Sequence, residues 1–139
     1  MNSKVLIIPC SGIGKCYGSV AREGAFMVVE DLCPAKTELM PLSLLVLGED
    51  ETRHRLSTAK SITIDGCKLA CAAKVVSESG GTVAHPVMVL DVHRRHRELK
   101  PTGIAELDEQ GLKLAQFLAA EVHERVEAMT RENDDAAAS

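Results

Sequence analysis

The sequence predicts an α/β protein: a three-layer α/β/α sandwich with a mostly parallel, four-stranded, Rossmann-like sheet. Strand-like apolar runs alternate with helical patterns along the chain. This order favours a parallel sheet with helices on both faces. Apolar residues make up 45% of the sequence but aromatic residues only 2%. The core must therefore consist mainly of Val, Leu, Ile and Ala, which is typical of parallel sheets.

Each element follows from a local pattern. Short apolar runs rich in Ile and Val predict strands, and apolar residues repeating every third or fourth position predict helices. Proline and glycine mark the ends of these elements. In chain order, the sequence predicts a strand over 4–9, a helix over about 17–32, a short strand over 37–42, an ambiguous apolar segment over 43–47, a polar helix over 49–59, a strand over 61–65, a helix over about 67–79, a strand over 83–92, a basic turn over 93–97 and a long helix from 108.

The length of 139 residues fits one domain, because a chain of this size buries roughly 70% of its extended surface. Neither an internal repeat nor a linker divides it. We expect a single domain over residues 1–130. Residues 131–139 are polar and Ala-rich, and we expect them to form a flexible carboxyl-terminal tail.

Three cysteines follow predicted strands. Cys10 comes directly after the first strand, and Cys67 and Cys71 come after the strand over 61–65. A spacing of four residues would put Cys67 and Cys71 one turn apart on a helix face. If the two strands are parallel neighbours, all three sulfurs gather at the carboxyl edge of the sheet, where α/β proteins place their sites.

Other readings of these residues stay open. Cys67 and Cys71 lie among alanines, so both thiols could equally belong to a helix core. Cys16, at the start of the first helix, could turn toward the same edge or stay a partly exposed thiol. Asp65 could be a ligand, a helix cap or a group that orients a thiol. We expect Cys33 to be structural.

Composition and motif spacing exclude several classes of function. The net charge of −4 and the scarcity of aromatic residues disfavour nucleic-acid binding. The apolar runs are too short for a membrane span, and no signal peptide is recognised, so we expect a cytoplasmic protein with reduced cysteines. Gly12, Gly14 and Gly18 do not have the dinucleotide-binding spacing. Where a phosphatase loop beginning at Cys10 would need arginine, the chain has Cys16.

Two segments together resemble a known family. Asp65-Gly66-Cys67 with Cys71 four residues later, and Pro9-Cys10-Ser11-Gly12 after an amino-terminal strand, resemble the DGC-domain family of zinc-binding proteins. The likeness extends from Lys4 to about Arg125. The resemblance implies a small prokaryotic protein whose clustered cysteines bind Zn²⁺, without implying a particular reaction.

The resemblance carries over by position to Cys10, Cys67 and Cys71. The family pattern has a fourth cysteine near the end of the second strand, where this chain has Met40-Pro41-Leu42. The fourth position is therefore left to water, Cys16, Asp65 or a histidine. An open position is typical of catalytic rather than structural zinc.

Three hypotheses follow. The first is a zinc-binding protein with Cys10, Cys67, Cys71 and Cys16 as candidate ligands. The second is a thiol-based redox or sulfur-transfer enzyme that uses Cys10 with Cys67 or Cys71. The third is an interaction module with inert thiols. A homodimer is left open, and the sequence identifies neither a substrate nor a protein partner.

Overall fold

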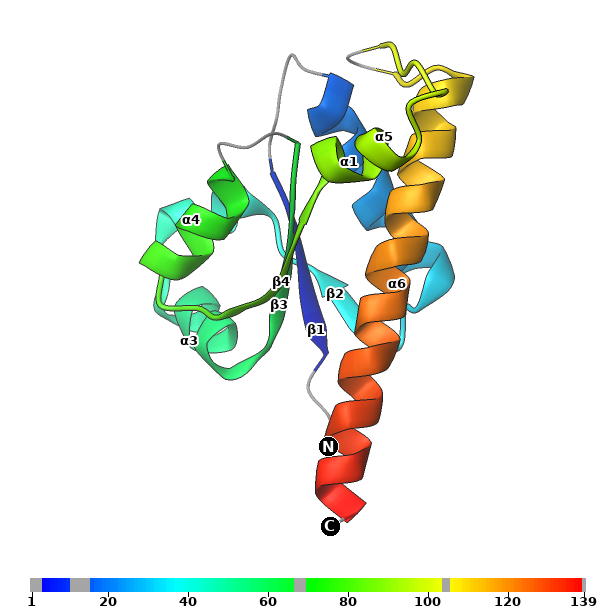
Figure 1. The fold of residues 1–139 in the computed structure, drawn as a ribbon. Helices are drawn as coiled ribbons and strands as arrows, with labels where there is room; N and C mark the ends of the chain where they lie inside the picture. Colours follow the sequence, from blue (N-terminus) through cyan, green and yellow to red (C-terminus); the bar gives the residue numbers. More distant parts are fainter. Residues whose placement is uncertain (1–3, 11–15, 67–69, 104–105, 139) are drawn as a thin grey trace.

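A four-stranded, fully parallel sheet forms the centre of the computed structural model, which describes residues 4–10, 16–66, 70–103 and 106–138, with side chains up to residue 131. The strands follow the order β2-β1-β3-β4 (Figure 1). Leu6 of β1 pairs with Glu38 of β2 and with Ser61 of β3. The predicted α/β fold is thereby confirmed. The strands are β1 (Val5–Pro9), β2 (Thr37–Leu39), β3 (Ser61–Asp65) and β4 (Val83–Met88).

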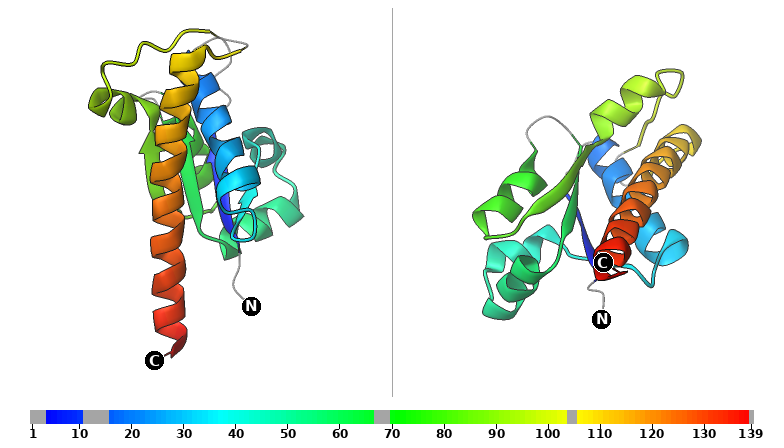
Figure 2. Two further views of the ribbon diagram at one scale, coloured as in Figure 1. Left: turned by 90° about the vertical axis from the view of Figure 1, so that its right-hand side faces the viewer. Right: turned by 60° about the horizontal axis from the view of Figure 1, so that its bottom comes forward.

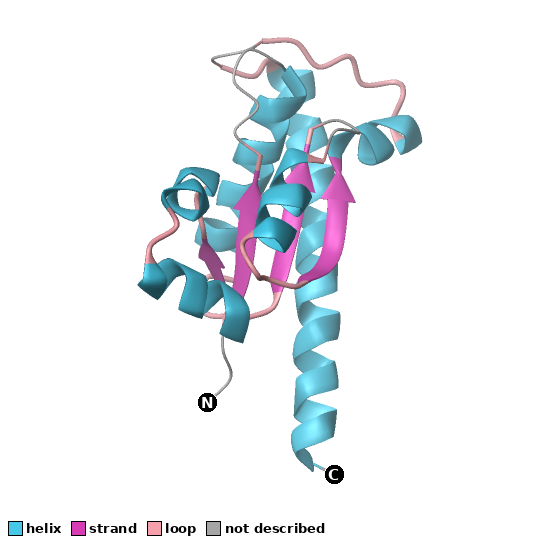
Figure 3. Ribbon diagram, turned by 90° about the vertical axis from the view of Figure 1, so that its left-hand side faces the viewer, coloured by secondary structure: helices cyan, strands magenta, loops and turns pink. Residues whose placement is uncertain are grey.

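The helices form two layers, one on each face of the sheet (Figures 1–3). One layer contains α1, η1, α5 and α6, which contact one another, and the other contains α2, α3 and α4. The helices are α1 (Cys16–Phe26), the π-helix η1 (Met27–Leu32), α2 (Leu42–Leu47), α3 (Asp50–Thr58), α4 (Cys71–Glu78), α5 (Val89–Arg95) and α6 (Glu109–Ala138).

The two central strands are buried on both faces. Leu6, Ile7 and Ile8 of β1 have no exposed surface, and every residue of β3 is buried. Such continuous burial explains why their sequences show apolar runs rather than an alternating pattern. β4 is an edge strand that is half-buried for most of its length. Its Pro86 is exposed there, where a missing N–H costs little.

Several predicted boundaries differ from the structure. The last strand was expected to run to Val92, but β4 ends at Met88 and α5 follows at once. The predicted basic turn over 93–97 is also wrong at its start, because residues 93–95 belong to α5. The ambiguous segment over 43–47 is helical, and α2 ends at Gly48 with a φ of 70°, a conformation that favours glycine.

The long helix α6 packs an apolar stripe against α1 and η1. Leu114, Leu118, Val122 and Val126 repeat every fourth residue, as predicted, and have no exposed surface. Asp108 precedes the helix and accepts a hydrogen bond from the Gly111 N–H at 2.8 Å, so it caps the amino terminus. α6 continues through Ala138, and a flexible tail stays a prediction. None of the described helices is both long and apolar enough to cross a membrane.

Candidate metal centre

The predicted thiol edge coincides with the point where the strand order of the sheet reverses. β1 is followed by β2 on one side and β3 on the other. In an open parallel sheet, the carboxyl ends of such neighbouring strands leave a crevice in which ligands bind. Cys10 directly follows β1, and Asp65 and Gly66 end β3. Two of the segments that carry candidate residues therefore meet at this edge.

Cys10 is held against the end of β3 by two hydrogen bonds. Its backbone N–H donates to the Ile64 carbonyl at 2.8 Å, which extends the ladder between the strands. Its Sγ accepts a hydrogen bond from the Gly66 N–H at 3.3 Å. The side chain is buried, with 9% of its surface exposed. The Gly66 N–H therefore fixes the position of the Cys10 sulfur at the end of β3.

The helix that carries Cys71 begins later than predicted. α4 starts at Cys71, and Ala70 before it has a φ of 52°, in the left-handed region that a right-handed helix does not contain. The argument that Cys67 and Cys71 share one helix turn is therefore wrong. Cys71 is exposed at the first position of α4, and Cys67 lies outside the described residues.

Asp65 caps helix α4. Its Oδ1 accepts from the Ala72 N–H at 2.7 Å and its Oδ2 from the Ala73 N–H at 3.2 Å. The side chain is buried, with 2% of its residue surface exposed. Burial raises the pKa of the Asp65 carboxyl more than these two backbone donors and Lys74 lower it. Of the roles left open for Asp65, the observed one is the cap, and both carboxylate oxygens take part in it.

The start of α1 lies beside the same edge. A Cβ built on Gly66 would approach the Gly18 backbone nitrogen and the Tyr17 Cβ to 3.2 Å, so the end of β3 touches the first turn of α1. Cys16 opens this turn and is half-buried. Burial, and then the negative charge of Asp108, raise the pKa of the Cys16 thiol. Unless a cation binds nearby, Cys16 therefore stays protonated at neutral pH.

A hydrogen-bonded pair at this edge was missed by sequence reasoning. The Tyr17 hydroxyl is hydrogen-bonded to His93 Nδ1, and His93 Nε2 lies 2.8 Å from the Leu99 carbonyl oxygen. Because a carbonyl only accepts, Nε2 carries the proton, and Nδ1 of a neutral ring accepts from the tyrosine. His93 was expected in a solvated turn. The available signal was that the only tyrosine of the chain directly follows Cys16.

Cys33 lies apart from these residues, at the amino-terminal edge of the sheet. It follows η1, and its carbonyl accepts from the Thr37 hydroxyl at 2.8 Å, where β2 begins. The side chain is buried, and this burial is the main reason that the pKa of the thiol is raised. A buried, protonated thiol behaves as a small apolar residue.

No cluster of three or more metal-binding side chains exists within the ranges that the structure covers. Those ranges include Cys10, Cys16 and Cys71 but not Cys67. The predicted convergence of Cys10, Cys67 and Cys71 therefore stays a prediction. The structure brings together Cys10, the end of β3 and the start of α1.

The comparisons with known proteins give one match. The family model of the DGC domain matches residues 6–111, which include all four candidate cysteines. No curated protein matches the chain, and no solved structure matches it.

Proposed function

Because the chain belongs to the DGC-domain family, we propose that it binds Zn²⁺ through the thiolates of Cys10, Cys67 and Cys71, with Cys16 as the fourth ligand. Thiolate sulfur is among the ligands that zinc prefers, and structural zinc sites are usually tetrahedral. Cysteines that hold zinc must be reduced, so the proposal also assigns the protein to a reducing compartment such as the cytoplasm.

The observation that carries the proposal is the hydrogen bond from the Gly66 N–H to Cys10 Sγ at 3.3 Å. Gly66 directly precedes Cys67, and consecutive Cα atoms are about 3.8 Å apart. Cys67 is therefore bonded directly to the residue whose N–H contacts the Cys10 sulfur. The donor also holds the Cys10 sulfur in place, as hydrogen bonds around metal ligands do.

Competing bonds reduce the choice of fourth ligand. Both oxygens of Asp65 accept hydrogen bonds from α4, and both ring nitrogens of His93 are hydrogen-bonded. Ligation by either residue would break existing bonds. Cys16 begins the turn that touches Gly66, and within the described ranges its side chain does not cap a helix. We therefore favour Cys16, and a water molecule is the alternative if Cys16 is not a ligand.

The residues around the thiols have positioning roles in this proposal. Gly66 fixes the Cys10 sulfur, Asp65 fixes the start of α4 beside Cys71, and the Tyr17–His93 pair ties the start of α1 to α5. With four thiolates the metal would be structural. With water in the fourth position, bound zinc would supply a Lewis acid that lowers the pKa of that water.

Metal analysis of the purified protein tests the proposal. We expect about one equivalent of zinc, by the stoichiometry of a single four-ligand site, and loss of that zinc in Cys10→Ala, Cys67→Ala and Cys71→Ala. Cys33→Ala is the matched control, because it removes a buried thiol at the opposite sheet edge and should keep full zinc content. Cys16→Ala distinguishes the two candidates for the fourth ligand. If this variant keeps its zinc, water rather than Cys16 occupies the fourth position.

The proposal fails if wild-type protein isolated under reducing conditions neither contains zinc nor binds added zinc. It also fails if Cys33→Ala loses as much zinc as the other variants, because the loss would then reflect general destabilisation. Far-ultraviolet circular dichroism of each variant distinguishes a lost site from a lost fold.

The same contact favours a second candidate function, thiol-based redox or sulfur transfer. In this alternative, the Cys10 thiolate attacks a low-molecular-weight disulfide, releases one thiol and forms a mixed disulfide. The Cys67 or Cys71 thiolate then attacks Cys10, forms the internal disulfide and releases the second thiol. Mass spectrometry of protein treated with oxidised glutathione should then show a link from Cys10 to Cys67 or Cys71. A protein that holds zinc and gives no such link would exclude this alternative.

A further inference from the structure

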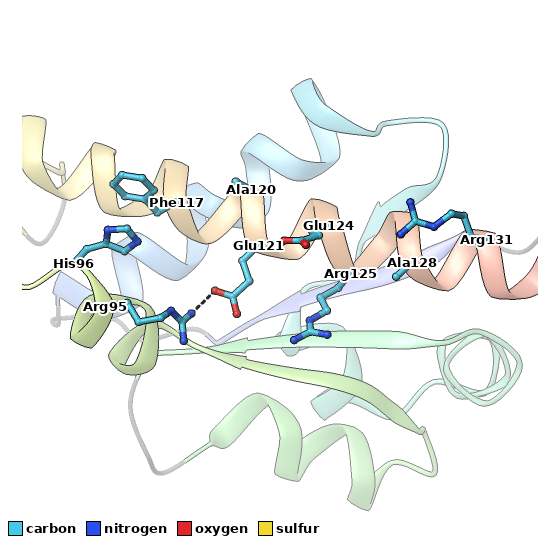
Figure 4. Close-up of a pocket in the computed structure, with 9 residues that line it drawn as sticks. All are labelled: Arg95, His96, Phe117, Ala120, Glu121, Glu124, Arg125, Ala128 and Arg131. Atoms are coloured by element: carbon cyan, nitrogen blue, oxygen red, sulfur yellow. Dashed lines mark hydrogen bonds and ion pairs between the residues drawn. The ribbon is translucent and has the colours of Figure 1, made fainter.

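A groove lies between α5 and α6 (Figure 4), and no cysteine is among the residues that line it. Its volume is about 630 Å³. One end is marked by the His96 ring stacked on Phe117, with centroids 3.9 Å apart and planes 10° from parallel. The Arg95 guanidinium forms an ion pair with Glu121 across it. The groove is lined by Arg95, His96, Phe117, Ala120, Glu121, Glu124, Arg125, Ala128 and Arg131.

The groove side of α6 differs from its buried side. The groove residues from Phe117 to Arg131 recur at intervals of three and four, so they share one face of the helix. Along this face, acidic Glu121 and Glu124 come first, and basic Arg125 and Arg131 follow. Arg125 takes part in none of the ion pairs among the described residues, and Figure 4 shows its side chain extending from α6 with no bond to the other residues drawn.

Most of the groove lining comes from α6, which continues past the residues that match the family domain. The DGC-domain match ends at residue 111, whereas α6 runs from Glu109 to Ala138. The carboxyl-terminal turns of α6 reach beyond the sheet (Figures 2 and 3). Over residues 117–131, α6 buries one stripe against α1 and η1, while most of the groove side of the helix stays exposed.

From this face, we infer that the occupant of the groove is a second copy of the chain, with the two α6 helices packed antiparallel about a twofold axis. In a twofold interface the same patch serves on both subunits. An antiparallel arrangement sets the acidic first half of one face against the basic second half of the other. Glu121 of one subunit then faces Arg131 of the other, and this pair occurs twice.

The dimensions of the groove fit a partner helix that inserts one row of side chains into it. Fourteen residues separate Phe117 from Arg131, which is about 21 Å of helix. A groove of about 630 Å³ spread over that length is too narrow for a whole helix, whose diameter is about 10–12 Å. It has room for one row of side chains. Ala120 and Ala128 lie on the lining, and their small side chains allow two helix axes to approach to about 8–10 Å.

The charges favour a second copy over a small anion. A site for a free phosphate or carboxylate brings its cations together. Here Glu121 pairs with Arg95. Arg125 and Arg131 of the lining are six residues apart, about 9 Å along the helix, with Glu124 next to Arg125. An antiparallel copy of α6 instead carries the same charges in the opposite order, so its basic residues lie beside the acidic residues of the first helix. Contact with that partner would also cover Phe117, which is 42% exposed.

Charge reversal with rescue tests the inference. Sedimentation velocity of the full-length protein, at concentrations up to hundreds of micromolar, should show twice the mass of one chain. Arg125→Glu with Arg131→Glu should give monomers, and so should Glu121→Arg with Glu124→Arg. An equimolar mixture of these two double variants should return to the dimer. Arg53→Glu with Lys113→Glu, two exposed positions outside the groove, makes the same charge change and should leave the dimer intact.

Three results would overturn the inference: a monomeric wild-type protein, double variants that stay dimeric, or a mixture that does not re-form the dimer. A monomeric wild-type protein whose melting temperature rises with inorganic phosphate, but not in Arg125→Glu, would assign the groove to a small anion instead. Since metal analysis is independent of these measurements, the zinc proposal stands or fails separately.

Discussion

Replacement of Asp65 tests how the end of β3 is joined to α4. Asp65→Ala removes the acceptors of the Ala72 and Ala73 N–H groups. Loss of a helix cap costs about 0.5–2 kcal/mol, and hydrogen bonds to charged groups contribute about 1.5–3 kcal/mol. The raised pKa of Asp65 shows that burial penalises the carboxylate, which offsets part of this gain. We therefore expect a net loss of about 1–3 kcal/mol in the free energy of unfolding.

Asp65→Asn separates the hydrogen bonds from the charge. The amide keeps one oxygen acceptor and avoids burying a charge, so we expect this variant to lose less stability than Asp65→Ala. The assay is urea unfolding at pH 7 followed by circular dichroism. A loss of about 2 kcal/mol moves the midpoint by about 1 M when m is about 2 kcal/mol/M.

Asp91→Ala is the control for this assay. Asp91 is an exposed residue of α5 whose ion pair with Arg94 measures 3.6 Å, and surface replacements of this kind change stability by about 0.5 kcal/mol or less. The cap argument is refuted if Asp65→Ala unfolds at the same urea concentration as Asp91→Ala. It is also refuted if Asp65→Asn is the more damaging of the two Asp65 variants.

Three further replacements probe other parts of the structure. Tyr17→Phe leaves His93 Nδ1 without its donor and should lower stability by about 0.5–1.5 kcal/mol, measured as a drop in melting temperature. Leu118→Ala should open a cavity between α1 and α6 at a fully buried position, with a loss of about 2–5 kcal/mol in urea unfolding. The pKa of Asp108 is lowered, mainly by the Thr102 and Gly111 N–H groups, so its stabilising effect is present above the unfolded carboxyl pKa of about 3.9 and is lost as pH falls through the lower folded value. Asp108→Asn should therefore show a smaller decrease in urea midpoint between neutral and acidic pH than the wild-type protein.

The sheet was predictable because its central strands are buried on both faces. Residues 61–65 were predicted as a strand, and β3 has these same bounds. The alternation of strands and helices was enough to predict parallel pairing. The neighbouring positions of β1 and β3, which the site argument assumed, are confirmed by pairs such as Pro9 with Ile64.

The end of β4 was not predictable from local pattern, because the apolar run continues past Met88 through Val89 and Leu90, and Val92 follows the single acidic residue Asp91. The tertiary structure ends the strand, since the last ladder pair joins Met88 to Asp65, where β3 itself ends. Among the described residues the ladder has no pair beyond this one, and the chain continues directly into α5. This change moves His93 from an expected solvated turn into the Tyr17 hydrogen bond.

The start of α4 was mispredicted for a related reason. A local rule looks for the capping residue directly before the helix, which made Cys67 the natural first residue after Asp65. The carboxylate instead reaches two N–H groups that lie seven and eight residues farther along the chain. Capping over such a distance depends on how the intervening segment folds, and sequence spacing does not contain that information.

Gly66 links these observations to the candidate metal centre. Its amide faces Cys10 Sγ, and its Cα lies so close to α1 that an added Cβ would press on Gly18 and Tyr17 at 3.2 Å. Only a residue without a side chain fits both contacts without displacing α1. Cys16 therefore comes near the thiol edge through the contact of α1 with β3, not through its spacing from Cys10. The glycine between Asp65 and Cys67 is thus what allows α1, which begins with Cys16, to pack this closely on the end of β3.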